Sequence, residues 1–138
     1  MRKILFRGKT VLGGAWVCGD LTHTTVDKRP MIRVHGENCA RNYMVDPATV
    51  GQYTGLKDRN GVRIFEGDVI KTHSGIVGLI AFGNHYDDEF GFCSNGWFFA
   101  GRDEVGDDCT LSLTDEWSSH MVIGNIHDNP ELLEVHHE

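Results

Sequence analysis

QYTGLKDRNGVRIFEGDVI, residues 52–70, combines turn and strand signals more densely than the rest of the chain. The Asn60-Gly61 pair favours a tight turn, because both residues tolerate the positive φ that such turns require. Gly55 and Gly67 supply further turn signals, and the apolar residues between them are typical of short strands. The stretch therefore predicts closely spaced turns joined by short strands, the pattern of a small barrel or a curled sheet.

Short strand signals continue on both sides of this stretch. Gly13-Gly14 and Asn95-Gly96 each predict a hairpin turn, since glycine accepts positive φ without steric cost. Asp46-Pro47 and Asn129-Pro130 each predict the start of a short helical turn, because the first residue can cap free N–H groups and proline suits the first helical position. Further strands are expected at residues 3–6, 10–12, 15–17, 21–26, 31–34, 69–72, 76–82, 90–93, 97–99, 111–113 and 121–123.

These signals predict a mainly β fold with a small SH3-like β-barrel core. Residues 66–80 support the barrel, since a Gly-Asp-Val segment followed by spaced glycines is common in SH3-like barrels, where the glycines serve sharp turns. We expect a single domain over residues 1–138 with short helical turns. Within it, residues 1–50 form an N-terminal β-rich extension, and residues 51–138 form the barrel-like core and a C-terminal motif.

The composition is that of an ordinary soluble protein, with 40% hydrophobic and 24% charged residues among 138. The cysteines form no C-x-x-C pair, and residues 1–7 contain no hydrophobic segment of signal-peptide length. No apolar run reaches the roughly 18 residues of a membrane-spanning helix. We therefore expect a cytoplasmic protein that does not enter a membrane and whose thiols are reduced, namely Cys18, Cys39, Cys93 and Cys109.

The formal net charge is −7 at pH 7, but this charge is divided along the chain. Residues 1–63 carry 11 basic and 5 acidic residues, a net of +6, whereas residues 64–138 carry 2 basic and 15 acidic residues, a net of −13. If folding mixes the two halves, the polarity cancels over the surface. If the halves stay apart, they favour self-association and leave a basic patch for an anionic partner.

Three blocks of sequence, in the right order, resemble the YopX-like proteins of phages and prophages. They are MRKILFRGK at 1–9 with WVCGD at 16–20, VDPATVGQYTGLKDRNG at 45–61 with IFEGDVI at 64–70, and IGNIHDNPELL at 123–133. The segment from about residue 81 to 120 matches no pattern of the family. The resemblance implies an SH3-like barrel core, a phage or prophage origin and residence in the bacterial cytoplasm. It carries over no catalytic or ligand-binding residue.

Two arrangements could carry chemistry, and a simpler interpretation competes with each. His85 and the carboxylates that closely follow it could bind a cation. However, Asp87 and Asp88 would face opposite sides of a strand, and a solvated acidic loop explains them without an ion. Cys93 with His85 or His120 could form a nucleophile and its base, although inert core thiols explain the cysteines. We therefore predict no catalytic residue, no metal and no cofactor.

A basic hairpin is the remaining candidate site. Its cationic side chains, together with one in the next strand, could contact phosphates; Lys57, Arg59 and Arg63 belong to the Asn60-Gly61 hairpin, and Lys71 to the strand that follows. Tyr53 and Phe65 nearby could stack on bases, as aromatic residues do in proteins that bind single strands. The competing interpretation is a solvated turn whose basic side chains pair with nearby carboxylates while Phe65 packs in the core.

The run Trp97-Phe98-Phe99 places three aromatic side chains next to one another. Neighbouring side chains of a strand point to opposite faces, so either both faces are covered or an exposed ring marks an interface. We therefore predict a non-enzymatic phage or prophage accessory protein that binds itself or a protein of the phage or its host. The alternative is a nucleic-acid-binding module that uses the barrel and the basic hairpin.

Overall fold

A computed structural model describes residues 3–103, 105–114 and 120–133 of the chain. The chain divides into two compact units, Met1–Gly55 and Leu56–Glu138. Each unit is built from antiparallel strands, and each contains one short 3₁₀ helix among the described residues. The expectation of a mainly β fold is therefore confirmed. The division falls inside strand β5 (Gly51–Lys57), so this strand begins in the first unit and ends in the second.

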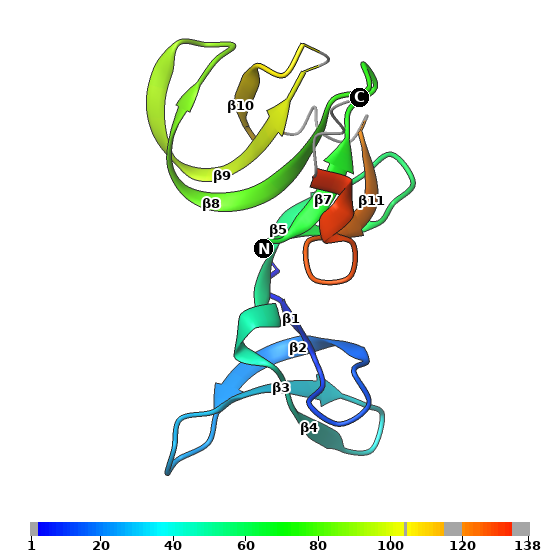
Figure 1. Ribbon diagram of the computed structural model, residues 1–138. Coiled ribbons are helices and arrows are strands. Elements are labelled where there is room, and N and C mark those ends of the chain that lie inside the picture. The colour runs from blue at the N-terminus through cyan, green and yellow to red at the C-terminus, as the bar shows by residue number, and fades with distance from the viewer. Residues whose placement is uncertain (1–2, 104, 115–119, 134–138) are drawn as a thin grey trace. The chain divides into compact units, whose positions relative to one another are not determined.

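The strands of the first unit form a meander, coloured blue to teal in Figure 1. They are β1 (Phe6–Lys9), β2 (Trp16–His23), β3 (Pro30–His35) and β4 (Ala40–Met44), in the spatial order β4-β3-β2-β1, and the start of β5 pairs with β1. The predicted glycine turn joins β1 to β2, with positive φ at Gly13 and Gly14. The predicted helical turn is η1 (Pro47–Thr49), where Asp46 accepts a hydrogen bond from the Ala48 N–H at 3.0 Å.

The sheet of the first unit has one apolar face, and Ile32 and Val45 are buried on it. Two glycines let its strands approach closely. A Cβ at Gly8 would lie 2.9 Å from the Val45 Cβ, and a Cβ at Gly19 would lie 2.1 Å from the carbonyl oxygen of Arg33. Both positions therefore need glycine because the space of a side chain is already occupied.

The second unit contains a sheet of five strands in the order β10-β9-β8-β7-β11. The strands are β7 (Asp68–Lys71), β8 (Val77–Asp87), β9 (Phe92–Arg102), β10 (Asp108–Ser112) and β11 (Met121–Asn125), and β6 (Arg63–Phe65) joins the end of β5. The second predicted helical turn is η3 (Pro130–Leu133). The described strands leave both sheets open, with β10 and β11 at the edges of this one.

The core of the second unit gathers around Phe99. Phe99 packs with Ile64, Ile70 and Ile80, and all four side chains are fully buried. Its ring lies over Gly78 of the neighbouring strand β8 and over Gly101 of its own strand, since a Cβ built on either glycine would lie 2.6 Å from the ring. The glycines therefore make room for the largest core residue.

The hairpin of β8 and β9 is long and strongly curled, and its far half bends toward β10 (Figure 1). Gly83 and Gly96 lie opposite each other in this hairpin, with φ of 151° and 157°. The predicted turn at Asn95-Gly96 is therefore wrong, because Gly96 lies inside β9 and the chain reverses at residues 88–91 instead. Here glycine serves the bend of a strand rather than a turn.

The aromatic run in β9 is covered on both faces by its own unit. Phe99 lies in the core, and Phe98 stacks on His85 with ring centroids 4.6 Å apart. Trp97 packs against the core and meets the edge of Phe82 at 4.9 Å. Of the two interpretations of this run, coverage within the chain is the one that the structure supports.

Candidate interaction surfaces

The predicted basic turn is organised by a buried carboxylate. Asp58 is 4% exposed. Its Oδ1 accepts hydrogen bonds from the N–H groups of Asn60 at 2.8 Å and Val62 at 2.9 Å, and its Oδ2 accepts one from the Val122 N–H at 2.9 Å. Asp58 therefore closes the turn and ties it to β11, while Gly61 takes the predicted positive φ of 79°.

The basic side chains of the candidate site lie around this turn. Lys57, at the end of β5, and Arg59 are exposed, and so is Lys71 at the end of β7, whereas Arg63 is half-buried at the start of β6. The N–H of Arg59 donates to the carbonyl of His120 at 2.9 Å, and Lys71 pairs with the adjacent residue 121 in the sheet. The fold therefore brings the backbones of Arg59 and Lys71 to the same end of β11.

The aromatic residues near this turn do not complete a base-stacking surface. Tyr53 and Phe65 are both buried, so neither ring presents a face to a ligand, which counts against the base-stacking alternative. Phe65 packs in the interior, as the competing interpretation predicted. Asp68 supports this placement, because its Oδ2 accepts the N–H of Phe65 at 2.7 Å.

Two histidines, His73 and His120, contact each other at the same end of β11. The rings of His73 and His120 stack with centroids 5.4 Å apart and planes 1° from parallel. The backbone N–H of His73 donates to Nδ1 of His120 at 3.3 Å. Burial, followed by the charge of His73, lowers the pKa of His120 below its ordinary value of 6.5, so a proton on this ring is disfavoured in the folded state.

The acidic tip of the β8–β9 hairpin contains a second buried carboxylate. Asp87 is 1% exposed, so the expectation of a solvated acidic loop is wrong for this residue. Its Oδ1 accepts the N–H groups of Glu89 at 2.9 Å and Phe90 at 2.8 Å, and its Oδ2 accepts the N–H of Ser112 at 2.8 Å. Burial alone would raise the pKa of Asp87, but hydrogen bonds from Phe90, Ser112 and Glu89 hold that pKa below its ordinary value of 3.8.

The same tip also covers the free edge of β10. Asp88 Oδ2 accepts the N–H of Thr110 at 2.7 Å, and the Asp88 N–H donates to the Thr110 carbonyl at 2.9 Å. An open edge strand is a template for unwanted pairing, and pointing carboxylates at its N–H groups is one way to block it. Asp87 and Asp88 therefore protect an edge, a role that needs no bound ion.

His85 belongs to the same network as Ser112, a contact that the sequence does not signal because 27 residues separate the two. His85 Nε2 lies 2.6 Å from the Ser112 Oγ, and Nδ1 lies 3.0 Å from the Gly83 carbonyl oxygen. The Ser112 hydroxyl also hydrogen-bonds Asp87. Because the carboxylate binds the serine rather than the histidine, this order differs from that of a catalytic triad, in which an acid orients the imidazole.

The hairpin does not bring Cys93 and His85 together as a nucleophile and its base. Cys93 lies opposite Tyr86 and His85 lies opposite Ser94, so Cys93 and His85 point to opposite faces of the ribbon. Burial, and then the charge of Asp88, raises the pKa of the Cys109 thiol above its ordinary value. Among the described residues, no group of three or more His, Cys, Asp or Glu side chains is arranged to hold a metal ion.

The hairpin also presents exposed aromatic side chains, which we call the aromatic arm. Its members are between 52% and 62% exposed, and they are Phe82, Tyr86, Phe90 and Phe92. Phe90 and Phe92 stack at 6.2 Å beside the turn. In the sequence the three adjacent aromatic residues at 97–99 are easy to recognise. Phe82 and Tyr86 are less obvious, because three other residues separate them although both side chains lie on the same face of β8. Their even spacing, four apart in a strand, is the signal that could have found them.

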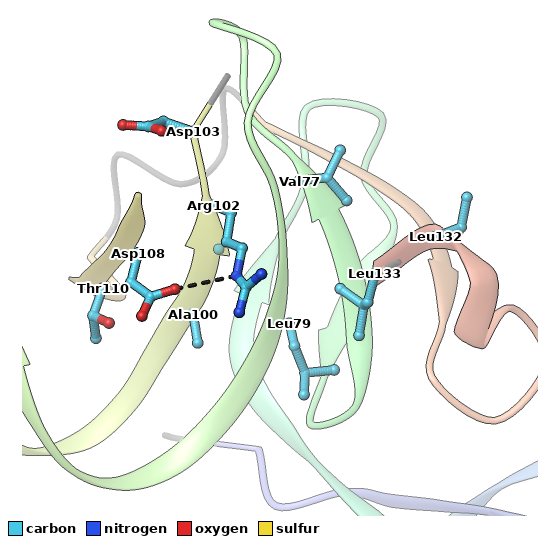
Figure 2. Close-up of a pocket in the computed structure, with 10 residues that line it drawn as sticks. Val77, Leu79, Ala100, Arg102, Asp103, Asp108, Thr110, Leu132 and Leu133 are labelled. Atoms are coloured by element: carbon cyan, nitrogen blue, oxygen red, sulfur yellow. Dashed lines mark hydrogen bonds and ion pairs between the residues drawn. The ribbon is translucent and has the colours of Figure 1, made fainter. Parts of the chain in front are cut away.

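A groove of about 970 Å³ lies in the second unit. Figure 2 shows Leu132 and Leu133 of η3 on one side, and Arg102, Asp108 and Thr110 of β9 and β10 on the other. The Arg102 Nε donates to Asp108 Oδ1 at 3.2 Å, and both side chains are largely exposed. The groove is thus apolar on its η3 side and charged on its β10 side.

These features define a two-unit antiparallel β protein whose charged turns are largely structural. The family model described as YopX protein matches residues 16–134, so the chain belongs to the YopX protein family. This range contains the central and closing blocks, while residues 1–9 lie outside it. No curated protein matches the chain.

The crystal structure of protein EF1440 from Enterococcus faecalis is similar to this chain. The match has a TM-score of 0.54 at 23% identity and covers 97% of this chain and 100% of that one. At this identity the similarity supports the fold alone. The described residues also include no helix that is long and apolar enough to cross a membrane.

Proposed function

We propose that this chain is a phage- or prophage-encoded accessory protein of the bacterial cytoplasm that acts without catalysis, by binding a protein. Membership of the YopX family and the family resemblance support the origin. We also propose that the second unit is an SH3-like barrel core, which its short strands and curled hairpin around Phe99 support. The partner is either a second copy of the chain or a protein of the phage or its host.

The aromatic arm is the observation that carries this proposal. Exposed aromatic side chains that gather on one element are typical of protein interfaces, where they bury large areas at a small loss of rotamer entropy. Asp87 fixes the turn at the tip of the hairpin by accepting the N–H of Phe90, and Phe90 stacks on Phe92. The two rings are therefore positioned before a partner binds. A prearranged anchor reduces the entropy lost on binding.

The test replaces two rings of the arm and measures association. Tyr86→Ser and Phe92→Ser together remove exposed aromatic surface without touching the buried core. We expect the double variant to lose self-association in sedimentation velocity, or to lose the partner that the unmodified chain captures from phage-bearing cells. Leu12→Ser and Val26→Ser, at apolar positions that are at least 90% exposed in the first unit, form the matched control. Equal binding by the double variant and the unmodified chain would refute the proposal.

The alternative of a nucleic-acid module built on the basic hairpin has weaker support. The exposed cations Lys57, Arg59 and Lys71 favour it, but the two rings that this alternative would stack on bases are buried. The second unit also carries 5 basic and 16 acidic residues over positions 56–138, and this net charge of −11 opposes a polyanion.

A further inference from the structure

We propose that protonation of His85 strengthens the attachment of the β8–β9 hairpin tip to β10, so that the position of Phe90 and Phe92 depends on pH. The inference rests on the number of hydrogen atoms that the contacts among His85, Ser112 and Asp87 require. These residues all lie in the second unit, and the test needs no partner. The inference therefore stands or falls independently of the protein-binding proposal.

The contacts of His85 determine which of its ring nitrogens must carry hydrogen. Nδ1 lies 3.0 Å from the carbonyl oxygen of Gly83, and because a carbonyl only accepts, Nδ1 must donate. Nε2 lies 2.6 Å from the Ser112 Oγ, and this hydroxyl also hydrogen-bonds the carboxylate of Asp87. An ionised carboxylate only accepts, so once the single hydrogen of the hydroxyl goes to Asp87, the contact with His85 requires a hydrogen on Nε2. All three contacts are therefore made at once only by the imidazolium ion, in which both nitrogens carry hydrogen.

A neutral His85 leaves one contact of this network unmade. With hydrogen on Nδ1 alone, Nε2 is an acceptor, and the Ser112 hydroxyl donates either to Nε2 or to Asp87 but not to both. In the first case Asp87 loses a hydrogen bond, and in the second case two acceptor atoms face each other at 2.6 Å. Protonation of His85 therefore adds one hydrogen bond to the network.

Asp87 is the residue that joins the hairpin tip to β10. Its Oδ1 accepts the N–H of Phe90 at 2.8 Å, and its Oδ2 accepts the N–H of Ser112 at 2.8 Å. Although burial alone would raise the pKa of Asp87, its hydrogen bonds hold that pKa below 3.8, so the carboxylate stays ionised at pH about 5.5. When His85 is protonated, Ser112 donates both its N–H and its hydroxyl to Asp87. This gives β10 a second hydrogen bond to the residue that closes the tip.

The surroundings of His85 act on its positive charge in opposite directions. His85 is half-buried, and partial burial disfavours the charged form. However, its ring stacks on Phe98 with centroids 4.6 Å apart, and the face of an aromatic ring attracts a cation. The carboxylates just after it in the chain, Asp87, Asp88 and Glu89, also favour a positive charge nearby.

The other titratable side chains of β8, β9 and β10 do not offset these carboxylates. Tyr86 and Cys93 form an opposed pair on the other face of the ribbon. Arg102 lies at the end of β9 that is far from the tip, where it pairs with Asp108. Burial raises the pKa of the Cys109 thiol, which therefore stays neutral in the range where histidine titrates.

The experiment follows the ring nitrogens of His85 by ¹⁵N NMR in the full chain, between pH about 7.5 and about 5.5. Their chemical shifts distinguish the neutral tautomers from the imidazolium ion. We expect hydrogen on Nδ1 alone at the higher pH and on both nitrogens at the lower pH. Over the same range, hydrogen exchange at the Ser112 amide, corrected for the intrinsic rate at each pH, should become about fivefold slower.

Variants separate this network from other effects of pH. His85→Gln cannot take up a proton and Ser112→Ala lacks the hydroxyl, so in both variants exchange at the amide of residue 112 should no longer slow at the lower pH. His120→Gln is the matched control, since it removes a histidine whose ring stacks on His73 instead. In this control the slowing should persist.

Three results would overturn the proposal. They are a His85 that is neutral at both pH values, unchanged exchange at Ser112 while His85 takes up its proton, and slowing that persists in His85→Gln. Because the ring shifts are measured on the unmodified chain, the test remains decisive even if Ser112→Ala fails to fold.

Discussion

The turn at residues 58–61 and the tip at residues 87–91 use the same device. In each, one oxygen of a buried aspartate accepts two N–H groups of its own turn, and the other oxygen accepts one from a distant strand. Asp58 reaches Val122 of β11, and Asp87 reaches Ser112 of β10. In the sequence, the segment around Asp58 suggests phosphate binding and the segment around Asp87 suggests an ion site. In the structure, both carboxylates instead accept hydrogen bonds from backbone N–H groups.

The two turns differ in what they leave exposed. Around Asp58 the exposed side chains include the cations Lys57 and Arg59, whereas around Asp87 they include the rings of Phe90 and Phe92. The side chains available for binding are therefore those that do not hydrogen-bond the backbone of their own turn.

The largest expected effect comes from removing either aspartate. Asp58→Ala and Asp87→Ala each leave three backbone N–H groups without their acceptor, two of the turn and one of a distant strand. We expect each variant to lose about 3 kcal/mol of unfolding free energy. Urea denaturation measures this loss. In the exposed control Asp88→Ala, where one N–H contact is lost, we expect about 1 kcal/mol. Equal losses in all three variants would end the claim that burial sets these two residues apart.

A smaller effect is expected from a substitution that reduces the curl of the β8–β9 hairpin. Gly83 has φ of 151° opposite Gly96, and alanine is disfavoured in that region, so Gly83→Ala should cost about 1 kcal/mol. Hydrogen exchange at the Thr110 and Ser112 amides should become faster, because the tip that covers them is displaced. Asn84→Ala, at the next position of the same strand, serves as the control. Unchanged hydrogen exchange at these amides in Gly83→Ala would show that the curl of the hairpin is not needed to protect the edge of β10.

The two turns should also respond to different ranges of pH. His120 has a lowered pKa when folded, so the unfolded chain binds protons more readily, and stability falls as pH drops below the ordinary value of 6.5. The lowered pKa of Asp87 contributes stability that is present above 3.8 and is lost as pH falls through the folded value. Melting curves of His120→Gln between pH about 7.5 and about 5.5 should show a weaker decline than the unmodified chain. An identical decline would remove His120 from this account.

The smallest effects on stability belong to the exposed side chains themselves. Arg59→Gln near the first turn and Phe92→Ser near the second should each change the unfolding free energy by less than about 0.5 kcal/mol. Phe92→Ser should nevertheless weaken protein binding. Calorimetry on both variants checks the first expectation, and a large loss in Phe92→Ser would show that the ring packs as core rather than as an interface.

Much of the local structure could be predicted from individual residues. The turns at Gly13-Gly14 and Asn60-Gly61 have the expected positive φ at their glycines, and proline begins each 3₁₀ helix of the described residues, η1 and η3. These features depend on backbone sterics within a few residues, so neighbouring letters suffice. The turn predicted at Asn95-Gly96 fails because positive φ at glycine serves a curled strand as well as a turn.

The sequence by itself predicted the mainly β character, most turns and the uneven charge of the chain, since each follows from local conformational preference or from counting. The strand expected at residues 10–12 was wrong, because residues 11–13 form the turn between β1 and β2. Only the tertiary structure decided that Asp58 and Asp87 are buried, that Tyr53 is unavailable for stacking and that Arg7 lies over Trp16. Burial and cation–ring contacts depend on residues far apart in the chain. The partners of an aspartate 64 or 25 residues away have no local signature, because the strand pairing that brings them together is set by the whole sheet.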